Sequence, residues 1–410
     1  MDTLTHLVAG ALTPLAFPRA PKRAALLGFG IAAGELPDID IFFGSTPDAL
    51  MTLHRGITHA LVAQPLLALL VVLPCYVWIR RSTAALSPHG GALSPDAFRA
   101  AGPCASGESP AGRGGTEGQP RLVPGQTGLG SLFLMALFAL YTHVYLDCMT
   151  TFGTQIFLPF SPARVGLPAM FIVDLLLTLP ALALMFYAWR QPPSFLPLPA
   201  ESPAGVRPGS RQTIAYGAFA SPKARRIARI GLAWMLLYPL ASLGVNAMTT
   251  AAYAPVLAPE GALRLLTEPF SPFVWKVVVE ERGTYRMGTL FLGSSRPPEF
   301  ATFVQPEPLL YETLKRQHPL FGQFEAFAPL MVQMERPATY LTQTEYDEQV
   351  TEYAFVDLRY LMSKDSPARF FGRNDPNFIL EARINDSGAL LAWRFLRRGA
   401  LTTTPWTLLQ

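Results

Sequence analysis

The chain has 410 residues, of which 50% are hydrophobic and only 15% are charged, and its mean hydropathy is +0.26. Soluble domains carry about 25% charged residues. The composition therefore excludes an ordinary soluble protein and a wholly disordered chain, and it favours a membrane protein with a soluble part. The net charge of +4 is too small to indicate nucleic-acid binding. The three cysteines have no paired spacing, which excludes a disulfide framework and a zinc ribbon.

Apolar stretches predict an α-helical membrane domain over residues 1–252, with about six spans. Four of them approach the roughly 20 residues that a helix needs to cross the hydrocarbon core. Two shorter ones at the N-terminus predict a helical hairpin. The stretches cover residues 3–17, 24–34, 60–79, 130–150, 169–189 and 230–252. A four-span arrangement, in which the first pair does not cross fully, is the alternative.

The distribution of positive charge predicts sidedness. With the N-terminus outside, fifteen Lys and Arg residues lie in the predicted cytoplasmic segments, and only Arg55 and Arg164 lie in the outer loops. The segment 82–129 is rich in Gly, Pro and Ser and is predicted to be a disordered linker. The Pro-rich segment 191–222 is predicted to be a surface loop. The chain that follows the last span is then extracytoplasmic.

Residues 253–410 have a different pattern, which predicts a small extracytoplasmic α+β domain. Two hairpins are expected, one around 281–284 and one around 385–388, because turn-forming residues separate strand-like runs there. The other expected elements are helices over 311–317 and 324–334 and a strand over 353–361.

Ionisable side chains occur in or beside the apolar stretches, where an unpaired charge is costly. They gather in five places: Thr5–His6, Glu35–Asp40, His54–His59, His143–Asp147 and Asp174. Each place has a structural explanation, such as a helix cap or an interfacial side chain. The predicted topology nevertheless puts all five on one membrane face, which favours a shared site.

The residue types and their spacing are typical of a metal site. His143 and Asp147 are four residues apart, so a helix presents both on the same face. His54 and His59 bracket a bend that contains Gly56. Imidazole and carboxylate ligands suit zinc, manganese or iron better than calcium. We therefore expect a divalent metal cofactor held by His54, His59, His143 and Asp147, with zinc, manganese or iron as the candidates and with Asp38 or Asp40 as a carboxylate that can bridge two ions.

These motifs carry a family resemblance. The segments Met1–His6, Pro37–Asp40, His54–His59 and His143-x-x-x-Asp147 resemble, in this order, the motifs of the bacterial inner-membrane metal-dependent hydrolases, and specifically their YdjM-like, LexA-regulated group. The motifs cover residues 1 to about 180, and the segments 269–276 and 356–360 also look like those of longer members. The resemblance implies an inner-membrane location and a metal set drawn from His6, Asp38, Asp40, His54, His59, His143 and Asp147.

The chain also has a more distant likeness to the zinc-dependent phospholipase C and single-strand nuclease fold. There too an early histidine, an aspartate, a histidine and a His-x-x-x-Asp helix follow in order. This chain lacks the later His-x-x-x-Glu pair, which argues against a three-metal cluster. The likeness serves only as an analogy for the class of substrate.

Together these features predict a membrane-bound metal-dependent hydrolase with its site on the outer membrane face. A phosphate or lipid-linked ester is the expected substrate, and membrane lipids are the expected partners. The candidate catalytic residues are Glu35 and Asp38 as general bases and Arg55 as the group that neutralises a substrate phosphate. Asp174 is a further buried acid. The alternatives are a non-enzymatic metal-binding membrane protein that transports, senses or scaffolds, and a metal site that only ties helices together.

Overall fold

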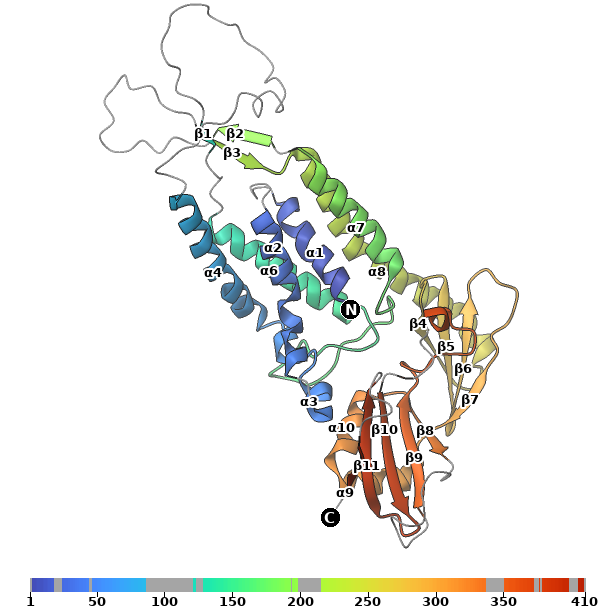
Figure 1. Cartoon of the computed structure of the whole chain (residues 1–410). Coiled ribbons are helices and arrows are strands. Elements are labelled where there is room, and N and C mark those ends of the chain that lie inside the picture. Colours follow the sequence, from blue (N-terminus) through green and yellow to red (C-terminus); the bar gives the residue numbers. More distant parts are fainter. Residues whose placement is uncertain are drawn as a thin grey trace, which may run out of the picture.

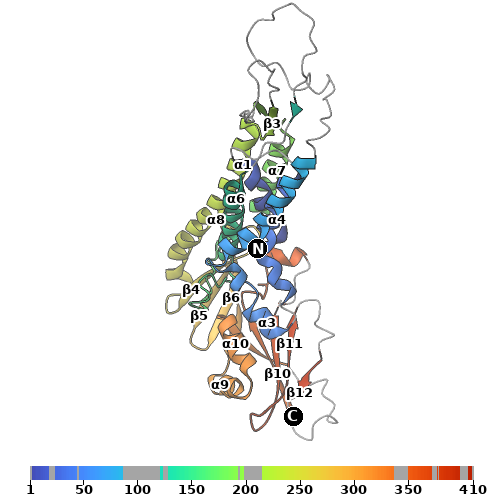
Figure 2. The ribbon, with the colours of Figure 1, turned by 90° about the vertical axis from the view of Figure 1, so that its left-hand side faces the viewer.

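The structure is a computed structural model with a helical part and a sheet part that lie end to end (Figure 1). The view turned by 90° shows the same elongated arrangement (Figure 2). The predicted linker 82–129 and the predicted loop 191–222 lie mostly outside the described residues. These are residues 2–17, 24–43, 46–85, 121–122, 128–192, 194–197, 215–336, 350–371, 376, 378–397 and 405–408.

The helical part is organised around one central helix, α1, which contacts α2, α6, α7 and α8. The long helices of the described chain are α1 (Thr3–Ala16), α2 (Ala24–Glu35), α4 (Gln64–Ala85), α6 (Leu129–Cys148), α7 (Leu175–Arg190) and α8 (Pro222–Leu257). Short elements between α2 and α4 carry the acidic motif and the histidine pair. They are η1 (Leu36–Phe42), α3 (Pro47–Thr52) and η2 (Ile57–His59). The strands β1 (Arg121–Leu122), β2 (Ser194–Pro197) and β3 (Ala215–Phe219) form a small separate sheet.

The backbones of α1 and α2 touch, because glycines lie where the two helices cross. A Cβ atom added to Gly10 would collide with the carbonyl oxygen of Gly30, and one added to Gly30 would collide with that of Gly10. One turn further along, Gly34 lies against the backbone of His6 and Gly10. This close approach brings the histidine motif on α1 next to the end of α2, from which the acidic motif continues.

We expect Gly30→Ala to lower the stability of the protein by about 1–3 kcal/mol, the usual cost of overpacking a close contact. Gly28→Ala, on the same helix, is the matched control, because no atom lies within 4 Å of a Cβ at that position. Alanine favours helix over glycine by about 1 kcal/mol, so the control should be neutral or stabilising. Denaturant unfolding in detergent measures both variants, and equal effects would contradict the close contact.

The prediction of about six spans is wrong. Among the described residues, only α6 and α8 are long and apolar enough to cross a membrane. At 1.5 Å per residue, the 14 residues of α1 and the 12 of α2 reach only about 21 and about 18 Å, less than the roughly 30 Å of a hydrocarbon core. The apolar stretch 169–189 is shortened because Asp174 caps α7, so that helix begins only at Leu175. The sidedness was counted over six spans and stays a prediction.

The small α+β domain predicted after the helices is also corrected, because the described strands of this part join into one large antiparallel sheet of nine strands. In sheet order from one edge the strands are β12 (Thr407–Leu408), β11 (Leu390–Arg397), β10 (Phe378–Asn385), β9 (Val350–Asp357), β8 (Met331–Arg336), β7 (Ala301–Val304), β6 (Thr284–Phe291), β5 (Val274–Glu281) and β4 (Ala262–Thr267). Local turn chemistry predicted hairpins, but not that distant hairpins share one sheet.

Both predicted hairpins are confirmed, as the pairs β5–β6 and β10–β11. The helices of this part are α9 (Pro308–Gln317) and α10 (Pro319–Phe327), and a short η3 (Pro367–Phe371) follows β9. The expected helix over 324–334 stops at Phe327, since from Met331 the chain pairs with β9 instead. Long-range strand pairing therefore overrides the helical pattern of this segment.

The sheet has an apolar core on each face. On one face α9 and α10 bury Leu314, Phe321 and Phe324 against β9 and β10. The other core combines residues of β4–β6 with residues of β8–β11, so the two halves of the sheet face each other across it. The buried Lys276 crosses between the halves, where its Nζ donates to the carbonyls of Leu358 at 3.2 Å and Arg359 at 3.1 Å.

Candidate metal centre

Four side chains from three segments meet at the end of α6. Asp38 of η1, His59 of η2, and His143 and Asp147 of α6 each offer one ligand atom, and these atoms all lie within 4.8 Å of one another. His143 and Asp147 share a face of α6 because they are four residues apart. His59, His143 and Asp147 are buried, and Asp38 is 24% exposed and marks the open side.

Five of the six separations between the four ligand atoms suit a tetrahedral metal ion. His59 Nε2 lies 3.2 Å from His143 Nε2, 3.4 Å from Asp38 Oδ1 and 3.2 Å from Asp147 Oδ2. His143 Nε2 lies 3.5 Å from each of the same two carboxylate oxygens. Ligands about 2.0–2.1 Å from a tetrahedral zinc ion are about 3.3–3.4 Å apart. These four residues could therefore hold a metal ion.

The imidazole rings of His59 and His143 are both held in orientation by polar contacts at Nδ1, the nitrogen that faces away from the cluster. His143 Nδ1 donates to the carbonyl of Gly34 at 2.5 Å, which leaves the Nε2 lone pair directed at the cluster. His59 Nδ1 lies 3.3 Å from Asp40 Oδ2 and 3.1 Å from Thr58 Oγ1. Partners of this kind on the second ring nitrogen are usual for histidines that bind metals, because they set the tautomer and the ring angle.

Asp147 also binds two groups outside the cluster of four. Arg55 Nη2 lies 3.0 Å from Asp147 Oδ1, and His6 Nε2 lies 3.3 Å from the same oxygen. His6 stacks on His143 with ring centroids 3.7 Å apart, and only its Nδ1 is left without a polar partner in the described structure. Both residues are buried, so Asp147 is surrounded by nitrogen groups on both carboxylate oxygens.

Asp40 and His54, which were predicted as ligands, lie outside the four-residue cluster. Asp40 Oδ1 lies 3.0 Å from His54 Nδ1, and its Oδ2 accepts from the backbone N–H of Arg55 and from Thr58 Oγ1, both at 2.9 Å. Asp38, which was predicted as a catalytic residue, lies in the cluster. Arg55 has a φ of +56°, a backbone conformation that non-glycine residues adopt rarely. This turn sends its guanidinium inward to Asp147.

The two remaining predicted acids lie in different surroundings. Glu35 ends α2 directly before η1; its Oε1 is buried without a hydrogen-bonding partner, and burial raises its pKa to about 7. Asp174 has a structural role that explains its burial. It caps α7 by accepting from the N–H of Leu177 at 3.0 Å, and it accepts from the Tyr238 hydroxyl at 3.2 Å.

The charges of the cluster are strongly coupled. Burial lowers the pKa of His59, but its contacts with Asp147, Asp38 and Asp40 outweigh burial and raise that pKa to about 10. Burial raises the pKa of Asp38, but hydrogen bonds with His143 and His59 hold it below its usual range. A positive charge is therefore strongly favoured between these side chains. The same carboxylates would stabilise a bound metal cation in place of the proton on His59.

Contacts from the sheet part support the segment that follows Asp147, and sequence reasoning did not assign them. Arg359 pairs with Asp357 at 2.7 Å and donates through Nη1 to the carbonyl of Thr151 at 2.7 Å and that of Phe152 at 3.3 Å. Within the supported segment itself, Arg164 donates to the carbonyls of Met51 at 2.5 Å and Gly153 at 3.1 Å. The only signal for Arg359 was its place in the segment 356–360, which looks familiar from longer relatives.

The helices and the cluster define a class: a protein that has two candidate membrane spans among its described residues and a buried Asp/His group that could bind a metal ion. The YdjM inner membrane protein family matches residues 1–253, more than half of the chain, and the chain belongs to this family.

No curated protein and no solved structure matches the chain. The predicted YdjM-like resemblance is thus confirmed, whereas the likeness to phospholipase C is not supported. The family description places the protein in the inner membrane and names no catalytic activity.

We expect His143→Ala to abolish metal binding, because it removes a ligand atom and the stacking partner of His6. Asp40→Asn should keep the site but weaken metal affinity about 10–100-fold, since it disturbs only the group that orients His59. His318→Ala, in the sheet part, is the histidine control and should leave the metal content unchanged. Mass spectrometry of untagged, detergent-purified protein gives the metal content per chain. An unchanged metal content in His143→Ala would contradict the assignment.

Proposed function

We propose that this protein is a metal-dependent hydrolase of the inner membrane that acts on phosphate or lipid-linked esters. The observation that carries the proposal is the four-residue cluster of Asp38, His59, His143 and Asp147, whose ligand spacing suits a tetrahedral ion. A divalent transition metal, when bound there, supplies Lewis-acid activation of an ester and of water. We expect zinc in the first place, with manganese or iron as the alternatives.

The chain offers a general base beside the cluster. Glu35 has one buried carboxylate oxygen without a hydrogen-bonding partner, and its pKa is raised to about 7 by burial. A base with a pKa close to neutral accepts a proton most effectively at physiological pH. Asp40, the other candidate, is already engaged by His54 and by the Arg55 and Thr58 donors. We therefore assign proton transfer to Glu35 and the orientation of His59 to Asp40.

Arg55 acts differently in this proposal from the role that the sequence suggested. Its guanidinium is buried, pairs with Asp147 at 3.0 Å and donates to Thr150 Oγ1 at 3.0 Å. The guanidinium of Arg55 is therefore already paired with the carboxylate of Asp147, one of the four candidate ligands. In the proposed site Arg55 holds Asp147 in place and balances its charge, and it does not contact the substrate.

The surroundings of the cluster favour a lipid-linked substrate. The cluster lies at the end of α6, one of the two candidate spans. Large apolar side chains are exposed on the short elements around it, among them Phe42 at 82% and Phe160 at 84%. Ile57 within the His54–His59 motif is exposed as well, and so are Leu61 and Val62, which follow it. Apolar side chains gathered on loops at the end of a span are typical of contact with the membrane interface.

We expect Glu35→Gln to reduce turnover about 10²–10⁴-fold and to retain the bound metal, because it removes a base but no ligand. Glu299→Gln is the matched control, since Glu299 is exposed and pairs only with Lys364 in the described structure. The assay follows release of p-nitrophenol from bis(p-nitrophenyl) phosphate by zinc- or manganese-loaded protein in detergent, together with hydrolysis of phosphatidic acid in mixed micelles.

These assays distinguish the hydrolase hypothesis from the non-enzymatic alternative. If metal-loaded wild type hydrolyses neither ester, the hydrolase hypothesis is wrong, and a metal transporter, sensor or scaffold is the hypothesis that remains. If Glu35→Gln is as active as Glu299→Gln, hydrolysis stands but the assignment of the base to Glu35 is wrong.

A further inference from the structure

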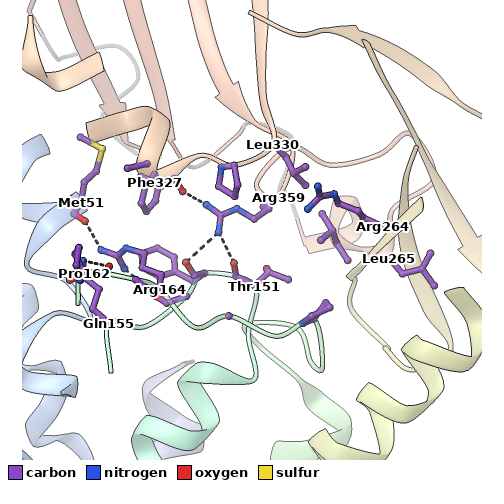
Figure 3. Close-up of a pocket in the computed structure, with 18 of the residues that line it drawn as sticks. Met51, Thr151, Gln155, Pro162, Arg164, Arg264, Leu265, Phe327, Leu330 and Arg359 are labelled. Carbon is purple, nitrogen blue, oxygen red and sulfur yellow. Dashed lines mark hydrogen bonds between the residues drawn. The ribbon is translucent and has the colours of Figure 1, made fainter. Parts of the chain in front are cut away.

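A second cavity, of about 960 Å³, lies between the helical part and the sheet part (Figure 3). Its walls come from α8, from the segment 151–168, from β4 and from the end of α10. Phe152 lines this cavity, and its ring centroid lies 4.7 Å from the Arg55 guanidinium and 5.9 Å from the Arg164 guanidinium. Arg55 pairs with Asp147 of the metal cluster, but none of the four cluster residues is among the described residues that line the cavity. The cavity is therefore distinct from the cluster and next to it.

The charged side chains that line the cavity are all positive. Arg164, Arg264 and Arg359 reach it from three different segments, and no Asp or Glu is among the described residues that line it (Figure 3). The carboxylates that pair with two of these arginines lie behind the wall: Glu280 with Arg264 at 3.0 Å, and Asp357 with Arg359 at 2.7 Å. A cavity lined by one sign of charge attracts ions of the opposite sign, here anions.

Arg164 differs from the other two arginines because backbone carbonyls, and no carboxylate, surround its guanidinium in the described structure. Its Nη atoms donate only to backbone carbonyls, those of Met51, Gly153 and His54, and within the described chain no carboxylate lies at ion-pair distance from it. Burial lowers the pKa of Arg164, but only to about 10, so the side chain stays charged at neutral pH. Carbonyl groups solvate a guanidinium without cancelling its charge. The charge of Arg164 is therefore available to an anion in the cavity.

The other polar side chains that line the cavity are uncharged, among them Gln155, Gln323 and Asn246. The three arginines are therefore the only charged side chains among the described residues of the wall.

We propose that this cavity binds the phosphate group of a small ester, such as a glycerol phosphate. Arg164 and Arg264 attract the phosphate, and the uncharged Gln155 and Gln323 lie in the wall beside them. The cavity volume lies within the range of small-molecule sites, about 300–1,000 Å³. The proposal does not depend on hydrolysis at the metal cluster, because none of these four residues belongs to that cluster.

The same chemistry could come from a membrane lipid or from a soluble metabolite. Asn246 and Thr250 of α8 line the cavity, and α8 is a candidate span, so a lipid headgroup could enter from the side of that helix. Calorimetric titration of the metal-loaded full chain in detergent with sn-glycerol 3-phosphate probes the soluble source. Native mass spectrometry of nanodiscs with phosphatidylglycerol, against phosphatidylcholine alone, probes the lipid source.

The decisive variant is Gln323→Glu, which keeps the size of the side chain and adds a negative charge to the cavity wall. We expect it to weaken binding of the glycerol phosphate group about tenfold or more, because like charges repel strongly in a partly buried site. Thr313→Glu makes the same charge change on an exposed position of α9, outside the cavity, and should leave affinity unchanged. Arg264→Gln removes a 52% exposed cation and should weaken binding about fivefold.

Saturable binding of either probe that falls in Gln323→Glu and Arg264→Gln but not in Thr313→Glu supports the proposal and identifies the source. Binding that is equal in all four proteins, or absent for both probes, overturns it. A loss of hydrolysis in Glu35→Gln without a change in glycerol phosphate affinity shows that the two sites are separate. The further inference and the proposed function therefore fail independently.

Discussion

The buried carboxylate of Asp147 is the constraint on which the rest of the site depends. It lies at the end of an apolar candidate span, where an isolated charge is costly. Arg55 and His6 approach one of its oxygens, and His59 and His143 approach the other. Removing any one partner would leave charge uncompensated in an apolar environment. The need to satisfy this carboxylate therefore draws α1, α6 and the segment between α2 and α4 together.

Close helix packing makes that convergence possible. Because glycines let α1 and α2 touch, the carbonyl of Gly34 comes within reach of His143 Nδ1. The sheet part then supports the site from the other side. Lys276 binds the carbonyls before and at Arg359, and Arg359 in turn holds the segment that follows Asp147. A chain of buried polar contacts thus connects the sheet to the cluster, and the arginine-lined cavity lies along it.

Much of the candidate site could be predicted from the sequence, because several of its residues belong to short local motifs. His143 and Asp147 form a local pair, since helical periodicity alone puts them on one face. His59 was identified by its motif. The choice between Asp38 and Asp40 was not accessible, because both lie in a 3₁₀ helix whose direction depends on tertiary contacts. In the structure the hydrogen bonds from Arg55 and Thr58 turn Asp40 away from the cluster.

The sequence by itself determined the family, the residue types of the site and both hairpins, because each of these depends on short segments: an ordered set of motifs, an i, i+4 spacing and local turn chemistry. Tertiary structure alone decided how many helices are long enough to cross a membrane, since Asp174 and the short turns end helices inside apolar runs. It also decided that all the described strands of the sheet part share one sheet, and which aspartate meets the histidines. Those outcomes depend on contacts between segments far apart in the chain, which local patterns do not encode.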